Sequence, residues 1–280
     1  MKIIECPRDA MQGIDEFIPT EIKIEYINKL LQVGFDTIDF GSFVSPKAIP
    51  QLKDTAEVVT KLDLSKTNTK LLAIIGNERG ATDASKFEEI DYLGFPFSIS
   101  EEFLKRNINS SIDKSFDRLK AIQEITIKNN KSLVVYISMA FGNPYGEHWN
   151  PELVSEWADK LSSEGIGIIS LADTIGVSNK ESINNLYKTV SKDNPKVEVG
   201  LHLHSNPNDS SLKIQSAINA GCNRIDSAIR GFGGCPMAED DLVGNIATEA
   251  VINEISDNSK GSFNPELFKE AIELSHSVFK

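Results

Sequence analysis

The stretch Leu201-His202-Leu203-His204 carries two imidazoles two residues apart within a short apolar run. Side chains at alternate positions of a β-strand point to the same face of a sheet, so both rings are expected to face one cavity. Imidazole nitrogen is a common ligand of divalent metal ions, and such a pair therefore indicates the beginning of a metal site. What the pair can do depends on the fold that surrounds it.

Similar runs recur along the whole chain. Short apolar segments rich in β-branched residues alternate with longer amphipathic segments, which is typical of buried parallel strands connected by helices. The predicted strands are Lys2–Glu5, Thr37–Phe40, Lys70–Ile75, Ile90–Gly94, Ser132–Ile137, Ile168–Leu171, Val197–His202 and Arg224–Ser227. The predicted helices are Thr20–Val33, Lys47–Leu62, Thr82–Phe87, Ile112–Lys128, Pro151–Ser163, Lys180–Lys192, Asp209–Ala220, Glu239–Ile255 and, last, Pro265–Phe279.

Eight strands with helices between them favour a closed (β/α)8 barrel, or TIM barrel, over an open doubly wound sheet. Alternation alone does not separate these two folds, but no dinucleotide-binding or phosphate-loop glycine signature follows the first strand. One barrel of this kind often takes about 250 residues. We therefore expect residues 1–280 to form a single catalytic domain, with residues 263–280 as a C-terminal helical extension.

Composition limits the partners. Hydrophobic residues make up 40% and charged residues 25% of the chain, as in an ordinary soluble globular protein. The net charge of −12 argues against nucleic acid or an anionic membrane as a partner. The three cysteines form no paired framework, the N-terminal residues are too polar for a signal peptide, and no apolar run approaches the roughly 20 residues of a membrane helix. These features predict a cytoplasmic protein.

In a barrel, polar residues at the carboxyl ends of the strands carry the chemistry. Asp9 follows the first strand, His202 and His204 end the seventh, and Asn245 follows the eighth. One carboxylate, two imidazoles and an amide, with positions left open, fit a catalytic divalent ion better than a closed zinc site. Taken alone, Asp9 and Asn245 would be turn residues. Two histidines and a carboxylate also occur in non-haem iron oxygenases, which the barrel pattern disfavours only by analogy of fold.

Two further residues stand out near these ends. Arg8 is permanently charged and suits an oxyanion that develops during a reaction, although most arginines form surface ion pairs. Cys235 lies in a glycine-rich loop that lets a thiol approach a ligand as an acid or a base. A small buried side chain is the commoner role of a free cysteine, and we prefer it for Cys6 and Cys222.

Six motifs in register span nearly the whole chain. They are Pro7-Arg8-Asp9-Ala10-Met11-Gln12, Ser42-Phe43-Val44-Ser45-Pro46-Lys47, Asp173-Thr174-Ile175-Gly176, His202-Leu203-His204, Gly233-Gly234-Cys235-Pro236 and Gly244-Asn245-Ile246-Ala247-Thr248-Glu249. Together they resemble the hydroxymethylglutaryl-CoA lyase family, within the wider group of metal-dependent lyase and synthase TIM barrels. The resemblance implies cleavage of 3-hydroxy-3-methylglutaryl-CoA to acetyl-CoA and acetoacetate by retro-Claisen chemistry, in a homodimer or larger homo-oligomer.

The resemblance also implies roles for particular residues. Mg²⁺ or Mn²⁺ would be the cofactor, and its ligands would be Asp9, His202, His204 and Asn245. Arg8 would stabilise the enolate, Asp173 or His202 would take the hydroxyl proton, and Cys235 would deliver a proton or close the pocket. The residues expected to bind the acyl-CoA substrate are Gln12, Asp39, Ser42, Lys47 and Thr174.

The chain departs from the family pattern at four places. The family usually has Gly at Ala10, Glu at Asp39, Gly at Ala172 and Asp at Ser205. These changes bear on the acyl group more than on the reaction class, since one methylene can move a polar contact by about 1 Å. The alternatives are a lyase for a related 3-hydroxyacyl-CoA, a Claisen-type synthase that condenses acetyl-CoA with a 2-oxo acid, and a degenerate barrel that binds a ligand without turnover.

Overall fold

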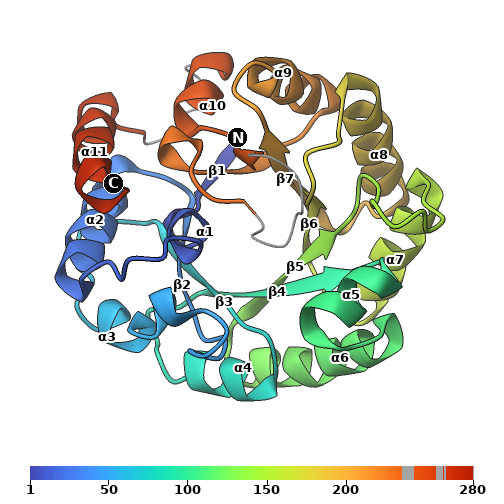
Figure 1. Cartoon of the computed structure of the whole chain (residues 1–280), viewed down its shortest axis with the longest axis horizontal. Coiled ribbons are helices and arrows are strands. Elements are labelled where there is room, and N and C mark those ends of the chain that lie inside the picture. Colours follow the sequence, from blue (N-terminus) through green and yellow to red (C-terminus); the bar gives the residue numbers. More distant parts are fainter. Residues whose placement is uncertain (235–242, 257–260, 262, 280) are drawn as a thin grey trace.

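A computed structural model of the protein describes residues 1–234, 243–256, 261 and 263–279. Its parallel strands are β1 Lys2–Glu5, β2 Thr37–Ser42, β3 Lys70–Ile74, β4 Tyr92–Ser98, β5 Ser132–Ser138, β6 Ile168–Asp173, β7 Glu198–Ser205 and β8 Arg224–Ser227. They form one sheet that closes by pairing β1 with β8 and β6 with β7. The helices surround this ring (Figure 1). The predicted TIM barrel is thus confirmed.

The helices follow the strands in the expected alternation. They are α1 Pro7–Gln12, α2 Thr20–Val33, α3 Thr55–Val59, α4 Glu78–Ala84, α5 Glu101–Ile108, α6 Ile112–Lys128, α7 Pro151–Ser163, α8 Lys180–Asp193, α9 Ser210–Ala220, α10 Thr248–Glu254 and α11 Pro265–Val278, with the short 3-10 helices η1 Pro50–Leu52 and η2 Ile229–Gly231. The predicted bounds are met by β1, β8, α2, α6 and α7. None of the described helices is long and apolar enough to cross a membrane.

Local chemistry explains why several helix ends were predictable. Asn150 accepts a hydrogen bond from the amide of Leu153, and Pro151 occupies the first helical position of α7. Gly34 and Gly221 end α2 and α9 with φ of 95° and 93°, a left-handed conformation that favours glycine. Capping residues of this kind are visible in the sequence, so the helix ends that carry them are the easiest to predict.

Two predicted helices are wrong. The segment Lys47–Leu62 divides into η1 and α3, because Pro50 has no amide hydrogen and disfavours a helical conformation at Ile49, which has φ −130° and ψ 81°. The predicted helix Glu239–Ile255 begins only at Thr248 in its described part. Before it, the short strand β9 Gly244–Asn245 pairs antiparallel with the end of β7. Sequence reasoning also missed the short helices α1 and α5.

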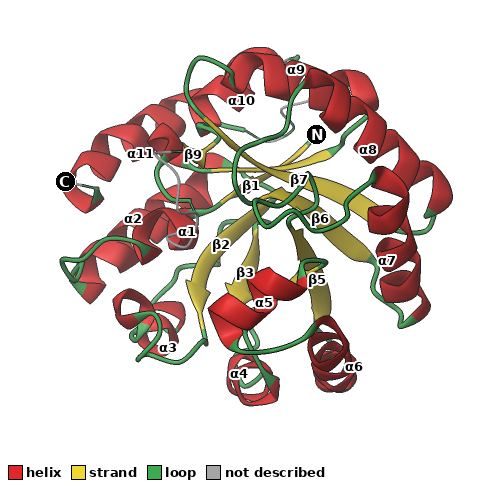
Figure 2. Cartoon of the chain, turned by 45° about the vertical axis from the view of Figure 1, so that its right-hand side comes forward, coloured by secondary structure: helices red, strands yellow, loops and turns green. Residues whose placement is uncertain are grey.

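The C-terminal extension predicted for residues 263–280 contains α11, which lies beside α2 in both views of the chain (Figures 1 and 2). The rings of Tyr26 and Phe279 meet edge to face there, with centroids 5.7 Å apart. The extension therefore packs on the outside of the barrel against α2, and its end reaches the loop after β8, where the rings of Phe232 and Phe279 stack with centroids 4.8 Å apart.

The interior of the barrel has two unlike walls. The β3–β5 wall carries an apolar cluster that contains Leu72, Ile74, Val134 and Tyr136. The β7–β8 wall carries polar side chains at alternate positions, which all point inward because strand residues alternate between faces. Its members are His202 and His204 on β7 and Arg224 and Asp226 on β8, and Gly200 on β7 leaves room for the Arg224 side chain.

Candidate metal centre and active site

The helix α1 begins two residues after β1 and places three polar side chains at the carboxyl end of the barrel. Pro7 starts this helix, so Arg8, Asp9 and Gln12 lie on one turn. The Nη1 of Arg8 donates to Asp9 Oδ1 at 2.8 Å and to Gln12 Oε1 at 2.7 Å, while Gln12 Nε2 donates to Asp9 Oδ1 at 3.0 Å. The missed helix therefore organises the first predicted motif.

Arg8 also forms a fork with the carboxylate of Asp39 at the end of β2. Its Nε and Nη2 donate to Asp39 Oδ2 at 3.0 and 2.6 Å. Burial opposes the charge on Arg8, but Asp39 and Asp9 outweigh this effect and raise the pKa of Arg8 further. Burial raises the pKa of Asp39 to about 6 against the opposing effect of Arg8. The result is a permanently charged guanidinium fixed between two carboxylates.

The two histidines face each other, as their spacing predicts. His202 Nδ1 lies 3.1 Å from Asp226 Oδ2, and His204 Nδ1 lies 3.1 Å from the carbonyl oxygen of Thr174. A carbonyl or carboxylate oxygen can only accept a hydrogen bond, so each Nδ1 is assigned as the protonated nitrogen that donates it, and each Nε2 keeps its lone pair. These two Nε2 atoms are only 3.2 Å apart. Two nitrogen lone pairs this close repel each other unless a proton or a metal cation lies between them.

The pKa shifts of the pair point in opposite directions. Burial, with the charge of a protonated His202, lowers the pKa of His204 to about 4, so this ring is neutral. Burial also acts to lower the pKa of His202, but the hydrogen bond and charge of Asp226 outweigh it and raise that pKa above 6.5. Burial tends to raise the pKa of Asp9, whereas Arg8 and the histidines bring it down to about 2. Asp9 is therefore an anion beside a neutral imidazole.

Asn245 completes the group from the short strand β9, where it pairs with His204. Its amide nitrogen donates to Asp9 Oδ2 at 2.6 Å and to the carbonyl of Phe232 at 2.9 Å. Gly233 lies against the same atoms with φ +95°, and a Cβ on it would come within 2.6 Å of Asn245 Nδ2 and 2.8 Å of the Asp9 carbonyl oxygen. The glycine-rich loop is thus required for the chain to approach the site this closely.

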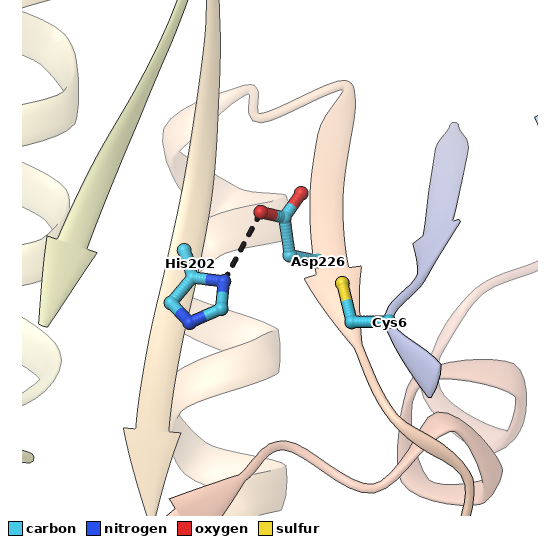
Figure 3. A group of neighbouring side chains, drawn as sticks. All are labelled: Cys6, His202 and Asp226. Atoms are coloured by element: carbon cyan, nitrogen blue, oxygen red, sulfur yellow. Dashed lines mark hydrogen bonds and ion pairs between the residues drawn. The ribbon is translucent and has the colours of Figure 1, made fainter. Parts of the chain in front are cut away.

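These side chains fit a divalent metal ion. Ligand atoms of Asp9, His202 and His204 all lie within 4.8 Å of one another, and the two imidazoles present lone pairs toward the same point. A carboxylate oxygen and two neutral nitrogens are suitable ligands for such an ion. A second group, Cys6, His202 and Asp226, is equally compact (Figure 3). Burial and nearby carboxylates raise the pKa of the Cys6 thiol well above its usual value, which disfavours the thiolate as a ligand.

Asp173, which the sequence singles out for proton transfer, is fully buried and already bonded. Its carboxylate accepts hydrogen bonds from the amide of Ser178 at 3.1 Å, from the Ser178 hydroxyl at 2.5 Å and from Lys213 Nζ at 3.0 Å. Lys213 Nζ also donates to the carbonyl of His204 at 2.7 Å. Thr174 accepts a hydrogen bond from Met139 at its hydroxyl. These contacts join the end of β6 to the end of β7.

The remaining residues of the predicted site have no described contact with the ligand atoms of Asp9, His202 and His204. Ser42 is buried at the end of β2, where its hydroxyl accepts a hydrogen bond from the amide of Val44 at 3.2 Å. Lys47 is exposed in the following turn. Cys235 lies outside the described residues, so its role stays a prediction.

Sequence reasoning missed two residues of the site. Asp226 gave a signal, because a charged residue stands inside the predicted buried strand Arg224–Ser227. Lys213 gave none, because a lysine on an amphipathic helix normally faces solvent. Both are buried, and both contact a residue of the predicted site.

A closed parallel barrel with a carboxylate, two imidazoles and a buried arginine at the carboxyl ends of its strands defines a TIM-barrel enzyme with a mixed oxygen and nitrogen metal-type site. Comparison with known families gives the narrower identity. The HMGL-like family matches residues 2–275, and the chain belongs to that family.

Named relatives agree with this assignment. The chain is 36% identical over 255 residues to the cytoplasmic 3-hydroxy-3-methylglutaryl-CoA lyase of Rattus norvegicus, covering 90% of this chain and 73% of the relative. The HMG-CoA lyase structure from Bacillus subtilis is 30% identical with a TM-score of 0.90, covering 100% of this chain and 94% of that one. An HMG-CoA lyase from Acinetobacter baumannii, in complex with coenzyme A and 3-methylmalate, is 28% identical with a TM-score of 0.89, covering 99% and 90%.

Proposed function

We propose that the protein is a divalent-metal-dependent carbon–carbon lyase that cleaves 3-hydroxy-3-methylglutaryl-CoA to acetyl-CoA and acetoacetate. The observation that carries the proposal is the placement of Arg8, a buried and permanently charged group, directly beside the carboxylate of Asp9 and close to the two facing imidazoles. Family membership and the names of the relatives support the same activity.

Asp9, His202, His204 and Asn245 would hold Mg²⁺ or Mn²⁺. Harder oxygen ligands on Asp9 and Asn245 suit both ions, and two imidazoles add affinity for Mn²⁺. When bound, such an ion supplies Lewis acidity to substrate oxygens. Asn245 reaches the site with its amide beside Asp9, so rotation of the amide group would present its oxygen in place of its nitrogen.

Arg8 would stabilise the negative charge that develops on the thioester oxygen when the C2–C3 bond breaks. A guanidinium has five N–H groups. In the described part of the chain, four of them point to Asp39, Asp9 and Gln12, which leaves one on Nη2 for the substrate. Because the group is already fixed by its partners, it needs little reorganisation during the reaction.

Proton transfer is the step for which the sequence left two candidates, Asp173 and His202. Asp173 would have to give up hydrogen bonds from Ser178 and Lys213 before it could accept a proton. His202 presents an unprotonated Nε2 to the cavity. With the metal bound, Nε2 of His202 would be a ligand, and Nδ1 carries the proton shared with Asp226, so His202 would have no lone pair for the substrate proton. Asp173 therefore stays the candidate base and would first exchange one of its hydrogen bonds, with Cys235 retained as a candidate for protonating the enolate carbon.

Several finer statements belong to the same proposal. Acyl-CoA would be the small-molecule partner, with Gln12, Asp39, Ser42, Lys47 and Thr174 as contacts. Replacement of the usual glutamate by Asp39 favours a second candidate function, cleavage of a related 3-hydroxyacyl-CoA, because the polar group that holds Arg8 is shorter. A homo-oligomer and a cytoplasmic location also remain proposals.

The test is a product assay. Protein stripped of metal is incubated with 3-hydroxy-3-methylglutaryl-CoA, with and without Mg²⁺ or Mn²⁺, and acetoacetate and acetyl-CoA are read by mass spectrometry. Both products should appear only with the metal. A parallel incubation with acetyl-CoA and a panel of 2-oxo acids tests the synthase alternative. Full activity without metal would refute metal dependence, and free thiol released only in the parallel incubation would establish the synthase.

A further inference from the structure

The β7–β8 wall continues below the metal-type site into the barrel, and several of its buried polar atoms have no partner. Among the described residues, Asp226 Oδ1, the Nε and Nη2 of Arg224 and the hydroxyl of Tyr136 are buried without a hydrogen bond. An unpaired buried polar atom costs about 1–3 kcal/mol. Four such atoms in one barrel interior therefore require an explanation, and nothing in the proposed reaction uses them.

Asp226 is the member of this group that touches the site. Its Oδ2 lies 3.1 Å from His202 Nδ1 and 3.5 Å from the hydroxyl of Ser170, and the side chain is 2% exposed. Figure 3 shows the carboxylate reaching from β8 to the back of the imidazole, on the side away from Nε2. A carboxylate that accepts the second N–H of a histidine ligand fixes both its tautomer and its orientation.

Arg224 and Tyr136 are the other members of this group, and Arg224 stands two residues before Asp226 on β8, with its side chain on the same face of the strand. Arg224 runs along the inside of β7 at Gly200, where a Cβ would come within 2.9 Å of its Cδ. Its Nη1 contacts Glu198 Oε1 at 3.3 Å, which uses only part of the guanidinium. The Tyr136 ring meets the His202 ring edge to face, with centroids 5.9 Å apart. Donors on Arg224 and Tyr136 are thus available near the unpaired Oδ1 of Asp226.

We propose that Asp226 is a positioning residue for His202, and that Arg224 and Tyr136 hold Asp226 through ordered water inside the barrel. The inference rests on the proposed metal site. Buried water typically makes about three hydrogen bonds to polar groups that otherwise lack partners, and the atoms identified here offer that number. In this arrangement Arg224 holds Asp226, and Asp226 holds the His202 ring so that its Nε2 faces the metal.

The first experiment measures Mn²⁺ affinity by calorimetry and electron paramagnetic resonance, which need no turnover. Asp226→Asn and Asp226→Ala should weaken binding about 10- to 100-fold, the usual effect of removing such a support. Asp54→Asn is the matched control: it removes the carboxylate of another buried ion pair, with Lys23, on the outside of the barrel. That variant should bind Mn²⁺ as the wild type does.

The second experiment keeps the inference testable if a variant at position 226 fails to fold. The chain has four histidines, so ¹⁵N-histidine spectra of the wild type loaded with Mg²⁺ are simple to assign. His202 should carry its proton on Nδ1. Arg224→Met should weaken Mn²⁺ binding less than Asp226→Asn, and the double variant should lose no more than Asp226→Asn alone, because the two residues act in series.

The outcomes separate the two proposals. If the wild type binds no Mn²⁺, the metal site and the inference are both overturned. If the wild type binds Mn²⁺ and Asp226→Asn binds it within twofold, the inference alone is overturned. If His202 carries its proton on Nε2 in the Mg²⁺-loaded protein, the inference and the assignment of His202 as a ligand are both overturned. Fully additive losses in the double variant would overturn the part assigned to Arg224.

Discussion

The two walls inside the barrel are both built from parallel strands, but they carry different kinds of side chain. On β3 and β5, the inward positions hold Leu72, Ile74 and Val134, which pack against one another. On β7 and β8, the inward positions hold ionisable groups that contact one another between the two neighbouring strands, and some of their atoms have no partner. The comparison indicates that stability is concentrated in one half of the interior and chemistry in the other. Three predictions test this division, and a fourth tests a buried carboxylate outside both walls.

The largest effect is expected from the charged group that faces the polar wall. Arg8→Gln should lower turnover on the order of 10²–10³-fold, because it removes the positive charge that we propose stabilises the developing enolate. Metal binding should persist, since Arg8 is not a ligand. Steady-state assays and Mn²⁺ titration check both points, with Arg118→Gln on the outer helix α6 as the control. An Arg8→Gln variant with normal turnover would remove the arginine from the mechanism.

The apolar wall should show the opposite behaviour. Leu72→Ala removes a fully buried side chain and should cost about 2–5 kcal/mol of unfolding free energy. Its Mn²⁺ affinity should stay unchanged. Chemical denaturation measures the loss, and Ile127→Ala, at a position 62% exposed, should change the free energy by less than about 0.5 kcal/mol. A loss of metal binding in Leu72→Ala would break the division between the walls.

A third test concerns a buried carboxylate on neither wall. Burial raises the pKa of Glu5 to about 8, against hydrogen bonds from Thr248 and the amide of Ile229. The folded protein then keeps a proton that the unfolded chain loses above about pH 4.5. Stability should therefore fall by on the order of a few kcal/mol as pH rises from about 4.5 to 8. Glu5→Gln should show a flatter curve by denaturant titration at several pH values, and parallel curves would contradict the shift.

The smallest effect tests the room made for Arg224. Gly200→Ala should cost about 1–3 kcal/mol, because the new Cβ would press on the buried Arg224 side chain. Gly167→Ala is the matched control, since a Cβ there meets nothing within 4 Å. Thermal unfolding compares the two variants. If Gly200→Ala were as stable as Gly167→Ala, the Arg224 side chain would have room to move away from the added methyl group.

Sequence reasoning predicted the fold and the centre of the site for a clear physical reason. Strand alternation and the spacing of His202 and His204 are local properties, and the carboxyl ends of barrel strands meet at one rim. Burial of Arg8 against Asp39 and pairing of Asn245 with Asp9 follow from that geometry. The roles of Arg8, Cys235 and the substrate contacts remain predictions.

What could not be predicted depends on contacts that form only in the folded chain. Lys213 looks like a surface residue, yet its ammonium group reaches Asp173 because α9 lies over the end of β6. The bonded state of Asp173 is equally invisible in the chain, because Ser178 approaches it through a turn. Helices as short as α1 carry too few residues for a periodic pattern, so the turn that joins Arg8, Asp9 and Gln12 appears only in three dimensions.

The contact between Asp9 and Asn245 joins positions 236 residues apart. During synthesis the carboxylate leaves the ribosome long before the amide and the glycine loop beside it, because more than 200 residues separate them. A chain released before β9 is made would carry Arg8, Asp9 and both histidines, but it would lack the strand that brings Asn245 to them. A chain that stops before Gly244 should therefore lack the complete group, and assembly of the site waits until β9 has been made.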